Sequence, residues 1–164
     1  MELAPKKIWL ALLTFVLLSS CRQNGPFLIL SCYDGDTCRA QDINSKVIKI
    51  RLACIDAPEL SQKRGRESRE FINDLVQKKN VTIDFVGKGA FKRDVAFLKL
   101  RDKSINLELL RHGMAEVYEG HTKYSKKECY KAQIAARHYK RGLWKDKNRI
   151  PPTLYRKLKR KGIL

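Results

Sequence analysis

Apolar and polar residues alternate along several short runs of the chain, which is the pattern of half-buried β-strands. In the run at 47–54, Ile48, Ile50 and Leu52 share one face and Arg51 lies on the other. Turn residues, such as the Asp-Gly pair after the first run, separate these segments. We therefore predict five strands, at residues 27–33, 36–40, 47–54, 81–86 and 95–100.

Other segments follow the period of an α-helix. We predict helices at residues 66–79, 106–111 and 126–141. In the first helix Phe71, Ile72, Leu75 and Val76 line one face, and Asn106 caps the second helix. A helix between the third and fourth strands, with more helices after the fifth, predicts an α+β fold. We expect a small five-stranded β-barrel of the OB type with about three helices.

The first residues follow a different pattern. A charged start and an apolar run at 8–18, too short to span a bilayer of about 30 Å, predict that residues 1–20 form a signal peptide. The sequence L-S-S-C that ends at Cys21 resembles the lipobox of bacterial lipoproteins, which implies cleavage before Cys21 and lipid on its sulfur. Residues 21–26 would then be a tether. The alternatives are an ordinary cleaved signal and an uncleaved anchor in which Cys21 is incidental.

The charge of the chain indicates the kind of partner. Its 164 residues include 35 basic and 17 acidic side chains, which give a formal net charge of +18. Loss of residues 1–20 would remove Lys6, Lys7 and Glu2 and leave +17, so the excess belongs to the body of the protein. Such an excess predicts attraction to polyanions such as nucleic acid.

The last residues concentrate part of this charge. Residues 147–164 form a basic C-terminal tail after the main domain, which we place at residues 27–146. Arg156 and Lys157, with Tyr155 beside them, are candidates for contact with a nucleic-acid backbone. A merely solvated tail is the alternative.

Two acidic stretches follow strands and stand out chemically. Asp34 and Asp36 flank a glycine, and Asp56 and Glu59 flank a proline, with Arg51 shortly before them. Hard divalent cations prefer carboxylate and carbonyl oxygens, and phosphates prefer the fork of an arginine. The combination predicts metal-assisted phosphoryl chemistry. Read singly, each stretch is also compatible with an ordinary turn or loop.

Several motifs together resemble the staphylococcal nuclease (thermonuclease) family. They are D-G-D-T at 34–37, R-L-x-x-I-D-A-P-E at 51–59, Arg93 at the start of the fifth strand, N-L-E-L-L-R-H-G-M-A at 106–115 and G-L-W at 142–144. The resemblance spans roughly residues 28–144 in the same order. It implies an OB-folded, secreted or surface-held, calcium-dependent enzyme that hydrolyses phosphodiesters of DNA and RNA and leaves 3′-phosphates.

The resemblance also implies roles for individual acidic residues. Asp36 and Asp56 resemble the direct ligands of one calcium ion, together with the backbone carbonyl of Ala57. Asp34 and Glu59 would lie near the ion and reach it through water. Calcium accepts such a set of oxygens.

The catalytic roles follow in the same way. Arg51 and Arg93 resemble the two phosphate-binding arginines, and Glu59 resembles the proposed general base. Paired guanidinium groups can stabilise the charge of a five-coordinate phosphorus, and a carboxylate can orient or deprotonate water.

The sequence departs from the family before the fifth strand. The family has Asp, a basic residue, Tyr-Gly and then the arginine, whereas this chain has G-A-F-K-R at 89–93. Lys92 is a candidate to restore the lost charge and contact nucleic acid, and Phe91 lacks the tyrosine hydroxyl. The aromatic platform of the family is also absent near Glu119, but Tyr118 and Tyr124 are close enough in sequence to contact a nucleic acid.

The cysteines leave alternatives open. After Cys21, an even number remains, and an exported chain could pair them in three ways. Buried free thiols are the alternative. These residues are Cys32, Cys38, Cys54 and Cys129.

Two functions of different classes agree with this sequence. The first is an exported calcium-dependent nuclease, anchored by lipid or secreted, acting as a monomer. The second is a catalytically weak nucleic-acid-binding module of the OB type at the cell surface. The complete reactive set of Asp36, Asp56, Arg51, Glu59 and Arg93 favours the enzyme.

Overall fold

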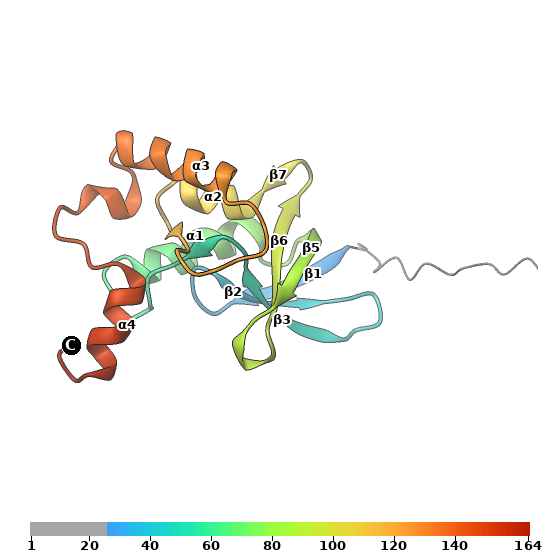
Figure 1. The fold of residues 1–164 in the computed structure, drawn as a ribbon. Coiled ribbons are helices and arrows are strands. Elements are labelled where there is room, and N and C mark those ends of the chain that lie inside the picture. Colours follow the sequence, from blue (N-terminus) through green and yellow to red (C-terminus); the bar gives the residue numbers. More distant parts are fainter. Residues whose placement is uncertain (1–25) are drawn as a thin grey trace, which may run out of the picture.

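The five predicted strands close into a barrel in the computed structural model, which describes residues 26–164 (Figure 1). The barrel strands run in the order β3-β2-β1-β5-β6, and a parallel pairing between β3 and β6 closes the circle. Their bounds are β1 Phe27–Cys32, β2 Thr37–Gln41, β3 Val47–Leu52, β5 Asn80–Lys88 and β6 Asp94–Leu100. The predicted α+β fold with a five-stranded barrel is thereby confirmed.

Alternation explains why these residues form strands. In β3, Ile50 and Leu52 are fully buried in the barrel, whereas Lys49 is exposed and Arg51 lies on the opposite face at the site described below. Ile29 of β1 and Leu98 of β6 are also fully buried in the same core. Burial of such side chains stabilises the barrel by about 1.5–3 kcal/mol for each residue.

Three short strands lie outside the barrel. The strand β7 adds to the edge of β6, and β4 pairs with β8 in a separate two-stranded sheet. That small sheet places Asp56 directly opposite Glu116. Their bounds are β4 Ile55–Asp56, β7 Lys103–Ser104 and β8 Glu116–Val117.

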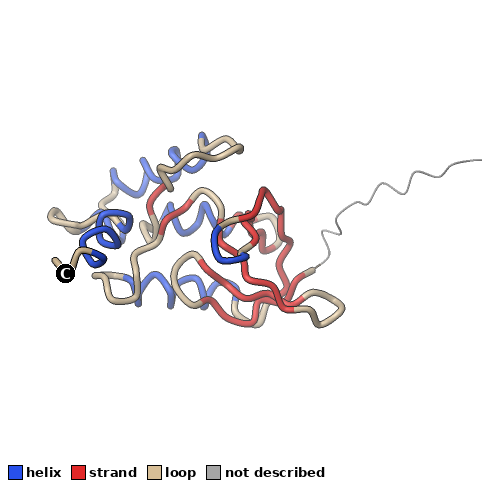
Figure 2. The backbone as a smooth tube through the Cα atoms, turned by 60° about the horizontal axis from the view of Figure 1, so that its bottom comes forward, coloured by secondary structure: helices blue, strands red, loops and turns tan. Residues whose placement is uncertain are grey.

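Four α-helices lie at one end of the barrel, where about three were predicted (Figure 2). Ile72 and Val76 of α1 are buried, and Phe71 and Leu75 are partly buried against the core, which confirms the predicted apolar face. The structure also contains two short 3₁₀ helices. The helices are α1 Gly65–Val76, η1 Ala90–Lys92, α2 Ile105–Arg111, α3 Lys127–His138, η2 Gly142–Lys145 and α4 Pro152–Arg160.

The predicted cap of α2 was wrong by two residues. The side chain of Ser104, not that of Asn106, accepts the capping hydrogen bond, from the amide of Leu107. Asn106 is fully buried; its side chain accepts a hydrogen bond from the amide of Leu98 at 2.9 Å and donates one to the carbonyl of Ala53 at 2.8 Å. It therefore joins α2 to the barrel.

All four cysteines of the described part form disulfides. Cys32 pairs with Cys38 across the turn between β1 and β2, and Cys54 pairs with Cys129 of α3. The alternative of free buried thiols is therefore wrong for these residues.

The C-terminal residues do not simply extend into solvent. In η2, the ring of Trp144 is contacted by the guanidinium groups of Arg137 and Arg149, whose central carbons lie 4.3 and 4.0 Å from the ring centroid. The chain then turns back so that α4 lies beside the loop that follows β4. The residues predicted as a basic tail thus form a helix packed on the domain.

The predicted signal peptide, the lipidation of Cys21 and most of the tether lie outside the described residues. Within residues 26–164, no helix is both long enough and apolar enough to cross a membrane.

Candidate nuclease site

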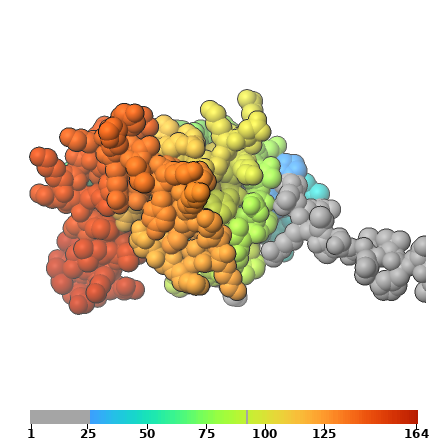
Figure 3. Space-filling model, turned by 45° about the horizontal axis from the view of Figure 1, so that its top comes forward, coloured from blue at the N-terminus to red at the C-terminus, as the bar shows by residue number. Residues whose placement is uncertain are grey.

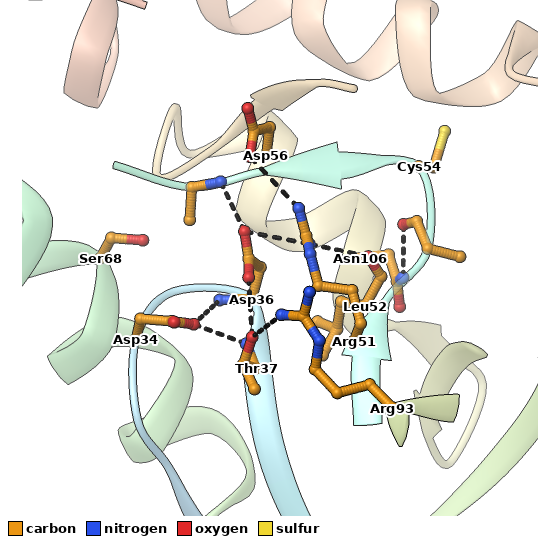
Figure 4. A network of polar contacts seen from close by, with 12 residues as sticks. Asp34, Asp36, Thr37, Arg51, Leu52, Cys54, Asp56, Ser68, Arg93 and Asn106 are labelled. Atoms are coloured by element: carbon orange, nitrogen blue, oxygen red, sulfur yellow. Dashed lines mark hydrogen bonds and ion pairs between the residues drawn. The ribbon is translucent and has the colours of Figure 1, made fainter. Parts of the chain in front are cut away.

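The first acidic stretch is a tight turn between β1 and β2. The carboxylate of Asp34 accepts hydrogen bonds from the amides of Asp36 and Thr37, at 3.0 and 2.7 Å. Gly35 is required at the tip because a Cβ atom there would lie 1.9 Å from the hydroxyl of Ser68. The turn therefore fixes Asp36 in one direction, toward the strand β3 (Figure 4).

Asp36 is buried but fully hydrogen-bonded. One carboxylate oxygen accepts from the amide of Ala57 at 2.8 Å and pairs with Arg51 at 3.0 Å, and the other accepts from the hydroxyl of Thr37 at 3.1 Å. Burial raises the pKa of Asp36 to about 7, against the opposing charge of Arg51; the nearby carboxylate of Asp34 raises it further.

Arg51 joins the two acidic stretches. Its two terminal nitrogens lie 3.0 Å from Asp36 and 3.2 Å from Asp56, and it also donates to the carbonyl of Leu52 at 3.1 Å. Figure 4 shows this guanidinium between the two carboxylates. The prediction that Arg51 lies beside the acids agrees with this position.

Asp56 is the most enclosed of the acids, with a side chain only 2% exposed. Besides Arg51, it accepts hydrogen bonds from the hydroxyl of Thr153 at 3.0 Å and from Arg156 at 2.8 and 3.1 Å. Both of these residues belong to α4, which follows Asp56 by roughly a hundred positions in the sequence. The C-terminal helix therefore covers Asp56.

The same arginine also holds Glu59. A second nitrogen of Arg156 lies 2.9 Å from a carboxylate oxygen of Glu59, whose side chain is 40% exposed. Burial alone would lower the pKa of Arg156, but its bonds to Asp56 and Glu59 outweigh this and raise it. Arg156 is thus charged and shared between the proposed metal ligand and the proposed general base.

Arg93 reaches the site from the other side of a pocket. It donates to the hydroxyl of Thr37 at 3.3 Å and to the carbonyl of Ala90 at 3.1 Å. The altered loop before it is unusual, because Phe91 has a left-handed backbone with φ 58° and a side chain that is 88% exposed. The departure from the family motif nevertheless leaves Arg93 facing the same pocket as Arg51.

This pocket, of about 480 Å³, brings together most of the predicted residues. Tyr118 and Tyr124 line it as well, and the hydroxyl of Tyr124 accepts a hydrogen bond from the amide of Cys54 at 2.8 Å. The polar and charged side chains that line it are Asp34, Asp36, Arg51, Glu59, Arg93, Tyr118, Tyr124 and Arg156.

Three predicted residues stand apart from the pocket wall. Asp56 lies behind it, under Arg51 and Arg156. Lys157 is exposed on α4, and the side chain of Lys92 lies outside the described part of the protein. The predicted contacts of these two lysines with nucleic acid stay predictions.

The donor atoms of the site suit a hard cation by type, since they are carboxylate oxygens and the carbonyl of Ala57. Their present arrangement suits it less well. Within residues 26–164, no group of three or more acidic, histidine or cysteine side chains is close enough to hold a metal ion as it stands. Arg51 and Arg156 also pair with carboxylate oxygens of Asp36, Asp56 and Glu59 that a cation would need.

Sequence reasoning missed two of these contacts. Thr153 was not predicted, and Arg156 was predicted to contact nucleic acid rather than Asp56 and Glu59. Pro152 at the start of a charged segment is a signal for a helix start that could have indicated α4. No local pattern could have indicated which distant residues this helix meets.

Comparison with known proteins agrees with this geometry. A sequence model of the staphylococcal nuclease homologue family matches residues 49–146. Among individual relatives, an "Uncharacterized endonuclease" of Haemophilus influenzae is 39% identical over 148 residues, covering 89% of this chain and 82% of its own. A protein of the same description from Escherichia coli O157:H7 is 35% identical over 130 residues, covering 78% and 82%. A "Micrococcal nuclease" of Shigella flexneri is 30% identical over 138 residues, covering 79% of each chain. This chain therefore belongs to the staphylococcal nuclease homologue family.

Proposed function

We propose that this protein is an endonuclease that hydrolyses phosphodiester bonds of DNA and RNA with the help of one calcium ion. The observation that supports it most is the convergence of Arg51, Arg93 and the acidic residues on one pocket, in a chain of this family. Two guanidinium groups on one side of an acidic cluster suit a phosphate diester, which is an anion with several acceptor oxygens.

Asp36, Asp56 and the carbonyl of Ala57 would hold the calcium ion, with Asp34 orienting the turn beside it. When bound, the ion would withdraw charge from a phosphate oxygen and favour attack at phosphorus. A cation with a flexible shell of six to eight oxygens suits donors that come from two separate loops.

The residues of the chain have separate roles in this proposal. Arg51 and Arg93 donate hydrogen bonds to the phosphate oxygens and strengthen them as negative charge builds up there. Glu59 orients the attacking water and accepts its proton as the new bond to phosphorus forms. The bond from phosphorus to the 5′ oxygen breaks, that oxygen takes up a proton from solvent, and a 3′-phosphate remains.

We also propose that the protein is exported, as a monomer anchored through lipid on Cys21, with a secreted form as the alternative. Two disulfides in the described part support an oxidising compartment. The net charge of +17 without residues 1–20 suits a partner such as nucleic acid.

The test is the rate of DNA and RNA cleavage by Arg51→Ala, Arg93→Ala and Glu59→Gln in saturating calcium. Each variant should lose about 10²–10⁴ in rate, the usual range for a charge stabiliser or a positioned acid–base group. Lys99→Ala is the matched control, since Lys99 is an exposed cation of β6, the strand that follows Arg93, and does not line the pocket.

Binding to a non-cleavable DNA and circular dichroism separate loss of chemistry from loss of binding or folding. Chelation should abolish cleavage, and magnesium should support it less well than calcium. If all three variants keep the rate of the unchanged protein, the proposed mechanism is wrong.

A second candidate function rests on one observation. Because Arg156 occupies Asp56 and Glu59, the protein could bind nucleic acid with little catalysis. In that case the unchanged protein would bind DNA in a salt-dependent manner but would not cleave it at any calcium concentration.

A further inference from the structure

The helix α4 contacts the acidic site but contributes little to the core of the fold. The barrel is closed by its own strands, and α4 buries only Pro152 completely. Leu154, an apolar residue of the helix, is 43% exposed. In Figure 3 the residues near the C-terminus, in red, gather at one end of the molecule beside the orange segment. Apolar packing therefore does little to hold α4 in place.

Polar contacts hold it instead, and they meet the loop that follows Glu59. The hydroxyl of Tyr155 donates to the carbonyl and the hydroxyl oxygen of Ser61, both at 3.1 Å, and the ammonium of Lys159 donates to the Ser61 hydroxyl at 3.2 Å. The side chain of Gln62 donates to the carbonyl of Ile150 at 2.6 Å. Contacts of this kind are individually weak and partly exposed, so they can be remade or released at small cost.

Arg156 is the charged centre of this contact. It bonds both oxygens of Asp56 and one of Glu59, and no other described cation pairs with Glu59. Its own side chain is 37% exposed and lines the pocket, so solvent and ligands can reach it. Asp56, at 2% exposure, lies beneath Arg156 together with Thr153 and Arg51.

A guanidinium and a divalent cation compete for the same oxygens. Carboxylates packed together without a cation repel one another, and a buried unpaired carboxylate is strongly unfavourable. An arginine on a weakly held helix can supply the missing charge and can leave when a stronger cation arrives. Arg51 is less suited to this role, because it comes from a barrel strand and also bonds the carbonyl of Leu52.

We propose that Arg156 is a tethered counter-ion of the cation site. It neutralises Asp56 and Glu59 while no divalent cation is bound, and a cation binds by displacing it, together with the hydrogen bond from Thr153 to Asp56. The helix α4 therefore sets the affinity of the site for its metal. This inference rests on the proposed function, which places a cation at these carboxylates.

The experiment is calorimetric titration of the protein with calcium, in the absence of nucleic acid. Arg156→Ala removes the competing charge and should tighten calcium binding on the order of tenfold. Arg156→Lys keeps the charge but loses the fork, and should lie between this variant and the unchanged protein. Arg160→Ala is the charge-matched control, since Arg160 is exposed on the same helix and has no ion pair among the described residues. Its calcium affinity should stay within about twofold of the unchanged protein.

Thermal unfolding supplies a second readout. With a chelator present, Arg156→Ala should melt at a lower temperature than the unchanged protein, because Asp56 is left buried with less compensation. In saturating calcium that difference should shrink or vanish, since the ion replaces the missing charge. A residue that merely fastens α4 would lower the melting temperature equally under both conditions.

The outcomes distinguish this inference from the proposed function. Equal or weaker calcium binding by Arg156→Ala would overturn the tethered counter-ion but leave a calcium-dependent nuclease intact. If neither the unchanged protein nor the variant binds calcium, both proposals fail. Tighter binding by the variant, with the expected change in melting, supports the inference.

Discussion

The barrel and the C-terminal segment at 146–160 are stabilised by opposite means. The barrel buries a continuous apolar core and holds one disulfide across its first turn, while a second disulfide ties it to α3. The C-terminal segment is fastened by charges, from Asp146 with Lys63 and Arg64 to Arg149 with Glu116. One region depends on the exclusion of water and the other on pairs that water and salt weaken.

The proposed site lies between these two regions. Asp34, Asp36 and Arg51 come from the barrel and its turn, whereas Asp56 and Glu59 are covered by α4. A rigid frame thus positions one part of the site and a replaceable contact shields the other. The comparison implies that changes in the core should lower stability, whereas changes in the C-terminal segment should mainly alter access to the acids.

The largest effect on stability is expected from a substitution in the barrel core. Leu98→Ala removes a fully buried side chain of β6 and should lower the free energy of unfolding by about 2–5 kcal/mol. Ile134→Ala on α3 is the control, because Ile134 is 63% exposed, and its change should stay within about 0.5 kcal/mol. Urea denaturation measures both. Equal losses in the two variants would contradict the assignment of Leu98 to the core.

The second effect should come from the titration of Asp36, which lies where the two regions meet. The pKa of Asp36 is raised to about 7 in the folded protein, from 3.8. The folded state therefore binds more protons than the unfolded state between these values, so this contribution to stability is complete below about pH 4 and is lost as pH rises to about 7. Without divalent cations, the free energy of unfolding should fall by up to about 1.4 kcal/mol per pH unit from this group.

Asp36→Asn is the control for this dependence, because the amide does not titrate. Glu116, whose pKa burial also raises, adds a slope of the same sign that remains in the variant. The difference between the two proteins, measured by denaturation from pH 4 to 7.5 with a chelator, isolates Asp36. Parallel curves would show that Asp36 does not take up a proton in this range.

The smallest effect is expected from salt on the C-terminal segment. About 1 M sodium chloride shortens the screening length to about 3 Å and weakens exposed ion pairs. Hydrogen exchange of the amides of α4 should become faster by about fivefold, while amides of β1 and β5 should keep their protection. Uniform acceleration in both regions would mean that they open as one unit.

The same contrast explains what could be predicted from the sequence. The barrel strands were predictable because burial of alternate residues leaves a local pattern, as in Ile48, Ile50 and Leu52. The acidic residues and Arg51 were predictable by chemical type and by motif. The contact of Arg156 with Asp56 spans 100 positions and leaves no pattern in either segment.

The sequence and the structure also differ in the cap of α2, because two neighbouring residues both suit that position. Ser104 and Asn106 are both good N-cap residues, and the sequence does not rank them. The structure selects Ser104 because Asn106 is needed in the interior, where its amide meets backbone groups from β6 and from the end of β3. A polar residue can thus fit a local rule and still be required by a tertiary contact.

The disulfide between Cys32 and Cys38 makes the closure of the acidic turn depend on oxidation. It closes the two ends of the segment that carries Asp34 and Asp36, and the second disulfide fixes Cys54 two residues before Asp56. In a reducing compartment, where the chain is made, neither bond persists. If the protein is exported as proposed, both bonds would form only after synthesis and transport, and the acidic turn would be closed last. On that proposal, the nucleic acids of the cell would be separated from the completed site in time as well as in space.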